Sequence, residues 1–287
     1  MLIGILPTQG CILSALWMIR ATTELDWQGQ DRIELPLVFD DNGHAGIPVR
    51  IHGKDELAYL DTGSPAPAMS QATATAAGIK FDSPKDKEAT ALAENVSVQV
   101  GAASMTLSIV LVSRGMPGAG LVLGEELFSK AVVDMDFGAG RLTLIRPETF
   151  KPPADTPMPV KLSYSRPTVK FKVNGRDPES CAIIDTGYGF GLALNSDLVA
   201  RLALPSNPNV RHSYTRADGT RHDSPALFPL DEVIIGGWIF RDVPAVSLAS
   251  GERLGDKSCG NLVGMNILAR HHVIFDMRND RIWLLPR

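Results

Sequence analysis

The sequence predicts an all-β protein of two similar lobes related by a pseudo-twofold axis, with a few short helices. Three observations lead to this fold class: the tripeptide Asp-Thr-Gly occurs twice, each copy follows a short apolar run, and the residues around the two copies match. The chain of 287 residues also contains 26 glycines, 20 prolines and only 6% aromatic residues. That composition is typical of many short strands joined by turns, and the length suits two domains.

The overall composition narrows the function classes. With 44% hydrophobic residues, 21% charged residues and a formal net charge of -4, the chain is an ordinary globular protein rather than a disordered or nucleic-acid-binding one. The three cysteines, Cys11, Cys181 and Cys259, form no CxxC pair, so neither a structural zinc nor any other metal or cofactor is expected. For the last two cysteines we favour buried thiols, and a disulfide between them is the alternative in an exported protein.

Residues 1–30 form a leader before the first predicted lobe. Residues 1–20 are apolar but interrupted by Pro7 and Gly10, so no stable membrane span is expected. The apolar run 11–19 with a small Ala21 after it suggests a signal peptide, although the basic residues that usually precede such a run are missing. A periplasmic or secreted location is therefore favoured slightly over a cytoplasmic one, and a frayed terminus or a misplaced start is the alternative.

The two Asp-Thr-Gly copies begin at Asp61 and Asp185, which are 124 residues apart. The apolar runs before them, 57–60 and 181–184, are short enough to be buried strands that end in a turn. Farther upstream, an apolar-alternating strand in each copy ends in a glycine turn, His-Gly in one and Asn-Gly in the other, which predicts a β-hairpin leading into each aspartate.

Downstream of each copy an apolar-Gly element ends at Gly124 or Gly264. From these glycines the copies align without a gap: an aspartate follows 12 residues on and an arginine 17 residues on, at Asp136 and Arg141 and at Asp276 and Arg281. Structural roles are expected for these aspartates, and the arginines either cover strand ends or pair with them. The segments 141–145 and 281–285 are predicted to be equivalent final strands.

These matches indicate that one unit has been duplicated. We expect an N-terminal lobe at 31–146, a Pro-rich and semi-rigid linker at 147–156, and a C-terminal lobe at 157–287. Short helices are predicted in equivalent places of both units, with Ser or Asn caps and a glycine end signal where the sequence offers them. Their expected ranges are 70–77, 125–130, 197–202 and 265–270.

A pseudo-twofold axis between duplicated units would bring Asp61 and Asp185 face to face. Two carboxylates a few ångströms apart share one proton, so one serves as a base that activates water while the other serves as an acid toward a carbonyl oxygen. In the same loops Gly63 and Gly187 permit tight turns whose N–H groups approach the carboxylates. Thr62 and Thr186 are expected to hydrogen-bond across the axis and hold the two loops together.

This order of elements resembles the retropepsin-like aspartic peptidases, arranged here as a tandem, bacterial-type protein. The resemblance covers both units and implies closed, barrel-like lobes, with Asp61 and Asp185 as the catalytic pair. It also implies that Gly124 and Gly264 are structural supports behind that pair. Ser64 fits the family's position after Asp-Thr-Gly, whereas Tyr188 does not, and its bulk would perturb the second carboxylate or crowd the cleft.

The family also closes a glycine-bearing hairpin, the flap, over its substrate. The C-terminal unit offers one at residues 212–222, where Ala217, Asp218 and Gly219 supply the turn. The matching stretch of the N-terminal unit, 83–93, is shorter, charged and free of glycine, so one working flap over an asymmetric cleft is expected. Tyr214 is the nearest candidate for a flap tyrosine, although surface packing is the favoured role for it.

The function expected from these residues is an aspartic endopeptidase, a monomer with an internal pseudo-dimer that acts on peptides or proteins. Two alternatives remain. A peptide-binding module would keep the cleft but lose catalysis through Tyr188 or a poor flap, and an assembly protein would use the Asp loops only to dimerise. The sequence leaves the substrate preference open, because cleft residues are scattered along several strands.

Overall fold

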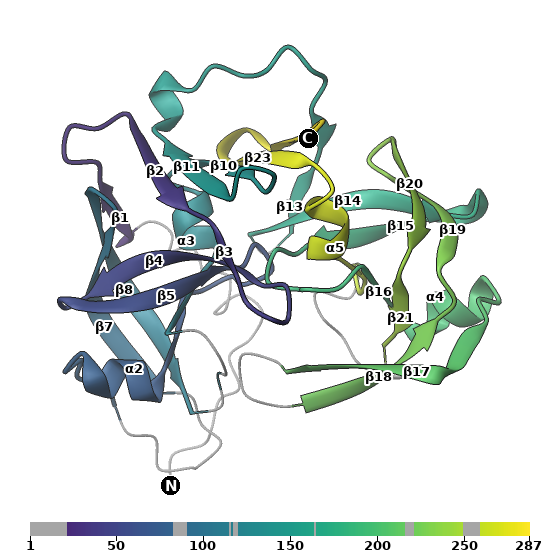
Figure 1. Cartoon of the computed structure of the whole chain (residues 1–287), viewed down its shortest axis with the longest axis horizontal. Coiled ribbons are helices and arrows are strands. Elements are labelled where there is room, and N and C mark those ends of the chain that lie inside the picture. The colour runs from purple at the N-terminus through teal and green to yellow at the C-terminus, as the bar shows by residue number, and fades with distance from the viewer. Residues whose placement is uncertain are drawn as a thin grey trace, which may run out of the picture.

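The computed structural model describes residues 22–82, 91–114, 116, 120–163, 165–215, 221–248 and 259–287. In this part of the chain the protein is mostly strands with a few short helices, which confirms the all-β, two-lobe fold class. Figure 1 shows one lobe built from the purple and teal half of the chain, the other from the green half, and a third sheet that joins them. That third sheet takes strands from both halves.

The first lobe is a barrel. Among the described residues its sheet has eight strands, and β7 pairs with both β4 and β8, which closes a ring in the order β4-β5-β9-β6-β8-β7. Its strands are β1 (Glu24–Asp26), β3 (Val38–Phe39), β4 (Ala45–Ile51), β5 (Lys54–Leu60), β6 (Ala68–Ser70), β7 (Ala91–Val100), β8 (Ala103–Ser113) and β9 (Leu121–Leu123). The ring encloses side chains with no solvent exposure, such as Ile47, Leu60 and Leu107.

The second lobe is a curled sheet that is less regular than the first. Within the described chain it has ten strands: nine follow one path from β17 to β20, and β13 lies off that path and pairs with β14. They are β13 (Lys161–Ser163), β14 (Arg166–Val173), β15 (Arg176–Ile184), β16 (Leu192–Leu194), β17 (Ser206–Thr215), β18 (Arg221–Leu227), β19 (Leu230–Ile235), β20 (Trp238–Val243), β21 (Ala245–Ser247) and β22 (Leu262–Val263).

The second lobe is thus a curled, less regular form of the predicted barrel-like lobe. Where the first lobe has the single long strands β7 and β8, the second has the pairs β18 and β19, and β20 and β21. Pro229 and Pro244 stand at the two breaks, and proline has no backbone N–H to continue a ladder. Asp242 beside the second break also adopts a left-handed conformation, with φ of 52°.

The third sheet has six strands in the described residues, in the order β12-β24-β23-β10-β11-β2. These are β2 (Arg32–Pro36), β10 (Val132–Asp136), β11 (Arg141–Ile145), β12 (Met158–Pro159), β23 (His272–Asp276) and β24 (Arg281–Leu285). The two predicted final strands, β11 and β24, are confirmed. The sequence did not predict that these two strands would lie in one sheet, with β23 and β10 between them.

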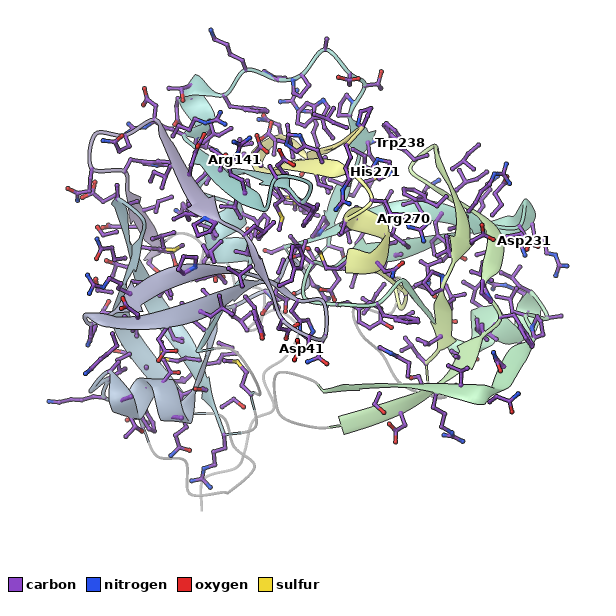
Figure 2. All side chains as sticks on the ribbon, in the orientation of Figure 1. Asp41, Arg141, Asp231, Trp238, Arg270 and His271 are labelled. Atoms are coloured by element: carbon purple, nitrogen blue, oxygen red, sulfur yellow. A yellow bond between two sulfur atoms is a disulfide. The ribbon has the colours of Figure 1, made fainter. Side chains whose placement is uncertain are left out.

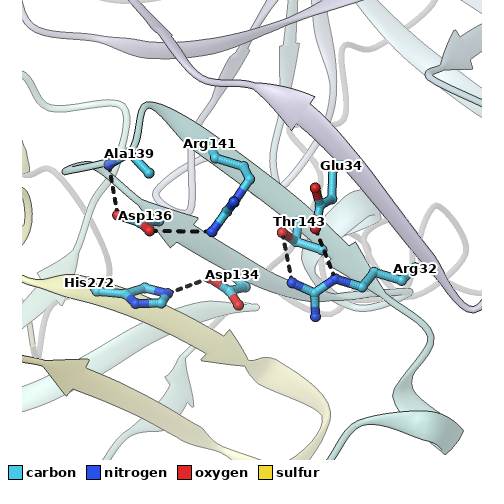
Figure 3. A network of polar contacts seen from close by, with 8 residues as sticks. All are labelled: Arg32, Glu34, Asp134, Asp136, Ala139, Arg141, Thr143 and His272. Atoms are coloured by element: carbon cyan, nitrogen blue, oxygen red, sulfur yellow. Dashed lines mark hydrogen bonds and ion pairs between the residues drawn. The ribbon is translucent and has the colours of Figure 1, made fainter.

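Polar contacts join the strands of this sheet (Figure 3). His272 Nε2 lies 2.5 Å from Asp134 Oδ1 and so links the strands contributed by the two halves of the chain. Arg141 pairs with Asp136 at 3.6 Å. The equivalent pair, Arg281 and Asp276, is shorter at 2.8 Å. Of the two roles considered for these arginines, pairing with the aspartates is confirmed.

The four predicted short helices are present: α2 (Gln71–Ala76), α3 (Glu125–Phe128), α4 (Ser196–Arg201) and α5 (Met265–Leu268). The Ser70 side chain accepts a hydrogen bond from Thr73 N and caps α2, while Asn195 accepts from Leu198 N and caps α4. Gly78, with φ of 65°, ends the first of these helices as expected. A 3-10 turn, η1 (Pro147–Thr149), opens the predicted linker, and another, η2 (Met277–Asn279), precedes β24.

One aromatic contact ties the second lobe to the segment before the third sheet, and one disulfide lies within the second lobe. Trp238 and His271 meet edge to face at 5.7 Å and lie together in Figure 2. Cys181 of β15 forms a disulfide with Cys259, with 5.2 Å between their Cα atoms. The expectation of two separate thiols is therefore wrong, and the alternative pairing is present. Bonds of this kind persist in oxidising compartments.

Candidate active site

Asp61 and Asp185 occupy equivalent places in the two lobes. Each follows a central strand, β5 or β15, that runs parallel to β9 or β22. Asp61 N donates to Leu123 O at 2.8 Å, and Asp185 N donates to Val263 O at 2.9 Å. Because each aspartate is held by the neighbouring strand, the rigid sheet of its lobe fixes the loop that presents the carboxyl group.

The threonines of the two Asp-Thr-Gly segments join the lobes. Thr62 N donates to Thr186 Oγ1 at 3.0 Å, and Thr186 N donates to Thr62 Oγ1 at 3.1 Å. Each hydroxyl then donates to the opposite strand, at Ile184 O and Leu60 O, over 2.6 and 2.8 Å. Both side chains are buried. The four reciprocal bonds hold the two aspartate loops against each other.

The two carboxyl groups form one coupled pair. In each loop the glycine N–H donates to the aspartate Oδ1, at 2.8 Å from Gly63 and 2.9 Å from Gly187. Burial raises the pKa of both carboxyls, and the negative charge of Asp61 raises the pKa of Asp185 further, well above its usual range. A hydrogen bond from Asp185 acts in the opposite direction on Asp61.

The contact between the loops leaves no room for a side chain at the two glycines. A Cβ on Gly63 would lie 2.6 Å from Asp185 Cγ, and one on Gly187 would lie even closer to Asp61. Real Cβ atoms do not approach other atoms within 3.0 Å, so any other residue here would push the carboxyls apart. Although the carboxyl groups lie deep among protein atoms, both aspartates keep some exposed surface, which leaves a face open to another molecule.

Gly124 and Gly264 lie directly behind the loops. A Cβ on Gly124 would meet the carbonyl oxygens of Ser64 and Asp61, and one on Gly264 would meet those of Tyr188 and Phe190. The residues after these glycines bond the same loops, since Glu125 N donates to Ser64 O and Met265 N to Tyr188 O. Both apolar-Gly elements thus pack against the backs of the aspartate loops.

Tyr188 is 7% exposed and packs in an apolar cluster of the second lobe with Ile183 and Val246. Its ring meets His212 edge to face at 6.2 Å, and Phe190 stacks on the same histidine at 4.2 Å. The tyrosine therefore fills space within its own lobe, and the two carboxyls still meet. At the equivalent place of the first lobe, Ser64 Oγ donates to Ala66 O at 2.7 Å.

The flap candidate is the hairpin β17–β18, whose strands pair from His212 and Ser224 out to Thr215 and Arg221. Its predicted turn residues, Ala217, Asp218 and Gly219, lie outside the described residues, as does the Tyr214 side chain. Most of the matching N-terminal stretch, 83–90, lies outside them as well. His212 anchors the stem of the hairpin on Phe190, beside the second aspartate loop.

A polar network beside Asp61 was missed by sequence reasoning. Asp40, in the loop between β3 and β4, accepts a hydrogen bond from the Tyr59 hydroxyl at 2.7 Å, and its carboxyl lies 2.9 Å from His44 Nδ1. Although burial opposes ionisation, the bonds from His44 and Tyr59 lower the pKa of Asp40 to about 2. Figure 2 shows Asp41 of the same loop at the junction of the lobes, where Gly43 approaches the second lobe.

A second buried carboxyl lies behind Asp61 in α3. Glu126 has no solvent exposure, and its Oε1 accepts a 2.7 Å hydrogen bond from Gly124 N. Burial, together with the charges of Glu125 and Asp61, raises the pKa of Glu126 to about 8. At neutral pH this carboxyl is therefore protonated. Its counterpart in the second lobe, Asn266, is exposed. Comparing the two repeats therefore does not predict that an acid is buried at this position.

Comparison with known proteins supports a peptidase. Residues 169–267 match the model of a family described as aspartyl protease. The matched segment contains Asp185, Gly187 and Gly264 and covers most of the second lobe. No curated protein matches the chain at a significant level. In the described residues no group of three His, Cys, Asp or Glu side chains could hold a metal ion, and no helix there is long and apolar enough to cross a membrane.

Proposed function

We propose that this chain is an aspartic endopeptidase of the tandem retropepsin-like type, in which Asp61 and Asp185 act together within one molecule. The observation that carries the proposal is the coupled, buried pair of carboxyls at the junction of the two lobes. The reciprocal threonine bonds and the aspartyl protease match support it. On this account residues 31–146 and 157–287 each supply half of the site, with 147–156 as the linker between them.

The two carboxyls take different roles. Asp61 is ionised and serves as the general base, because it accepts the hydrogen bond of its partner. Asp185 is protonated and serves as the general acid, because burial and the charge of Asp61 both raise its pKa. One proton shared by two acids is the state in which both roles are filled at once.

Hydrolysis then follows from these protonation states. Asp61 removes a proton from a bound water as its oxygen attacks the scissile carbonyl carbon, while Asp185 donates its proton to the carbonyl oxygen. The tetrahedral species collapses as the amide nitrogen takes a proton from Asp61, and the C–N bond breaks. One hydroxyl proton of that species returns to Asp185, which leaves the pair with one proton, as at the start.

The remaining loop residues hold the pair. Thr62, Thr186, Gly63, Gly187 and Ser64 keep the two carboxyls in contact, and Gly124 and Gly264 support the loops from behind. The hairpin carrying Ala217, Asp218 and Gly219 serves as the flap over a peptide or protein substrate. Since both halves of the site come from one chain, the working unit is a monomer.

A transition-state analogue separates a peptidase from a peptide-binding module with the same fold. A statine-type peptide, which carries a tetrahedral hydroxyl in place of the scissile carbonyl, is expected to bind at least about 100-fold tighter than the matching substrate peptide. Calorimetry with both peptides measures the ratio. Equal affinities, with the substrate peptide intact after incubation, would support the binding module instead.

A further inference from the structure

A basic side chain lies opposite Asp61 in the first lobe. Strands β4 and β5 form a regular antiparallel ladder whose last pair is Gly46 with Tyr59. If this register is extended by two residues past the end of the ladder, His44 comes opposite Asp61. Residues in this relation place their side chains on the same face, with Cβ atoms about 5 Å apart. The His44 side chain keeps 30% exposure, so it borders the site rather than the core.

The second lobe repeats this arrangement with a different residue. The ladder of β14 and β15 ends with Thr168 opposite Ile183. If this register is extended by two residues, Arg166, which pairs with Ser163 on its other side, comes opposite Asp185. His44 and Arg166 therefore occupy equivalent places, one beside each aspartate, in two ladders that have the same register relative to the carboxyls.

In each lobe the basic residue acts electrostatically on the aspartate opposite it. The pKa of each aspartate is raised mainly by burial, and the basic group of the same lobe lowers it: His44 acts on Asp61, and Arg166 acts on Asp185. In the first lobe Asp40 holds the imidazole: its Oδ2 lies 2.9 Å from His44 Nδ1 and also accepts the hydrogen bond of the Tyr59 hydroxyl.

Other titratable groups face the pair from the elements packed around it. Glu126 of α3 lies behind Asp61 and is protonated up to about pH 8, so it adds no charge in acid solution. Asp40 is ionised above about pH 2, and burial with the bond to Asp40 raises the pKa of Tyr59 far above its usual range. The basic groups that act on the pair are therefore the His44 imidazole and the Arg166 guanidinium.

We propose that His44 and Arg166 are positioning residues of the aspartate pair, one basic group per lobe, that stabilise its single negative charge and set the pH range in which that charge exists. This inference rests on the proposed function and adds to it the control of its pH dependence. The guanidinium keeps its charge at every pH at which the pair works.

The pH profile of kcat/KM reports the ionisation of the free pair and tests the inference. Arg166→Gln is expected to move both the acid and the alkaline limb upward by about one pH unit, since a nearby cation lowers a carboxyl pKa by about that much. Arg166→Lys, which keeps the charge, is expected to restore the profile largely. His44→Asn is expected to move the acid limb upward, by about half a pH unit or more.

Variants at two exposed basic residues of the first lobe control for general effects. His52→Asn removes an exposed imidazole at the β4–β5 turn, and Arg50→Gln removes an exposed arginine paired with Asp55. Both variants are expected to leave the acid and alkaline limbs of the kcat/KM pH profile unchanged. Carbon-13 NMR titration of the aspartate carboxyls in the same proteins gives a readout that needs no peptide cleavage.

The outcomes separate the inference from the function. Limbs and carboxyl titrations that stay unchanged in Arg166→Gln and His44→Asn would overturn the inference, while cleavage by the wild type would still uphold the peptidase. Carboxyl titrations that shift as expected in a protein that cleaves no peptide would uphold the electrostatic role and contradict the peptidase. A shift equally large in the control variants would also overturn the inference.

Discussion

Replacing either Asp61 or Asp185 with asparagine is expected to abolish peptide hydrolysis and leave the protein folded. Each variant removes one of two groups that must exchange protons with water and substrate, a loss of about a thousandfold or more in kcat. Asparagine Oδ1 still accepts the hydrogen bond that Gly63 or Gly187 donates, so the loop geometry is kept. The two effects are measured as kcat on a cleaved peptide and as the melting temperature of each variant.

Asp136→Asn is the matched control for this prediction. Asp136 is also repeated in both units, but it pairs with Arg141 in the six-stranded sheet, so its loss is expected to lower stability slightly and leave kcat unchanged. Mixing the Asp61→Asn and Asp185→Asn proteins is expected to restore nothing. Recovered activity in the mixture would mean that the two halves of the site come from different chains.

Glu126→Gln is expected to stabilise the protein above neutral pH. The pKa of Glu126 is 4.5 in its ordinary state and about 8 in the folded protein, so the folded state holds a proton that the unfolded state has released. The stability gained from the protonated form is complete below pH 4.5 and is lost as pH rises toward 8, by about 1.4 kcal/mol per pH unit. Glutamine has no proton to lose and avoids that decline.

Melting temperatures of the wild type and Glu126→Gln at several pH values test whether this carboxyl lowers the folding stability as pH rises. The two proteins are expected to melt together near pH 4.5 and to diverge by several degrees at pH 8, because Gln Oε1 keeps the bond from Gly124 N. Glu94→Gln, on the exposed face of β7, is expected to show no such divergence. Parallel curves for Glu126→Gln and the wild type would show that this carboxyl is ionised in the folded protein.

Local features of the fold were predictable from the sequence because they depend on neighbouring residues. The His52-Gly53 and Asn174-Gly175 turns, the capped helices α2 and α4, and the final strands all follow from short patterns. The meeting of Asp61 and Asp185 followed from the repeat, since duplicated units that pack about an axis bring equivalent residues together.

Features that depend on distant residues were not predictable in the same way. The six-stranded sheet requires β10 and β23, which are well separated in sequence, to find each other. The disulfide between Cys181 and Cys259 closes over a separation of 78 residues and depended on a compartment that the composition left open. The irregular shape of the second lobe depends on breaks at Pro229 and Pro244, whose effect on the sheet is clear only once the strand pairing is known.

The two basic residues beside the aspartates show this limit most clearly. The two-residue turn at His52-Gly53 fixes the register of β4 and β5, so the position of His44 opposite Asp61 could have been found by counting. In the second lobe the register shifts between Phe171 and Val173, and this bulge is what places Arg166 opposite Asp185. Counting from the Asn-Gly turn alone selects a different residue.

Hydrolysis of a fluorogenic peptide library by the wild-type chain, from about pH 3 to pH 8, tests the central claim most directly. A pair that works with one shared proton is active only between the ionisation of its first and second carboxyl. The account predicts cleavage with a bell-shaped profile and an optimum on the acid side of neutrality. No cleavage by the folded protein, or a rate that stays flat across this range, would contradict it.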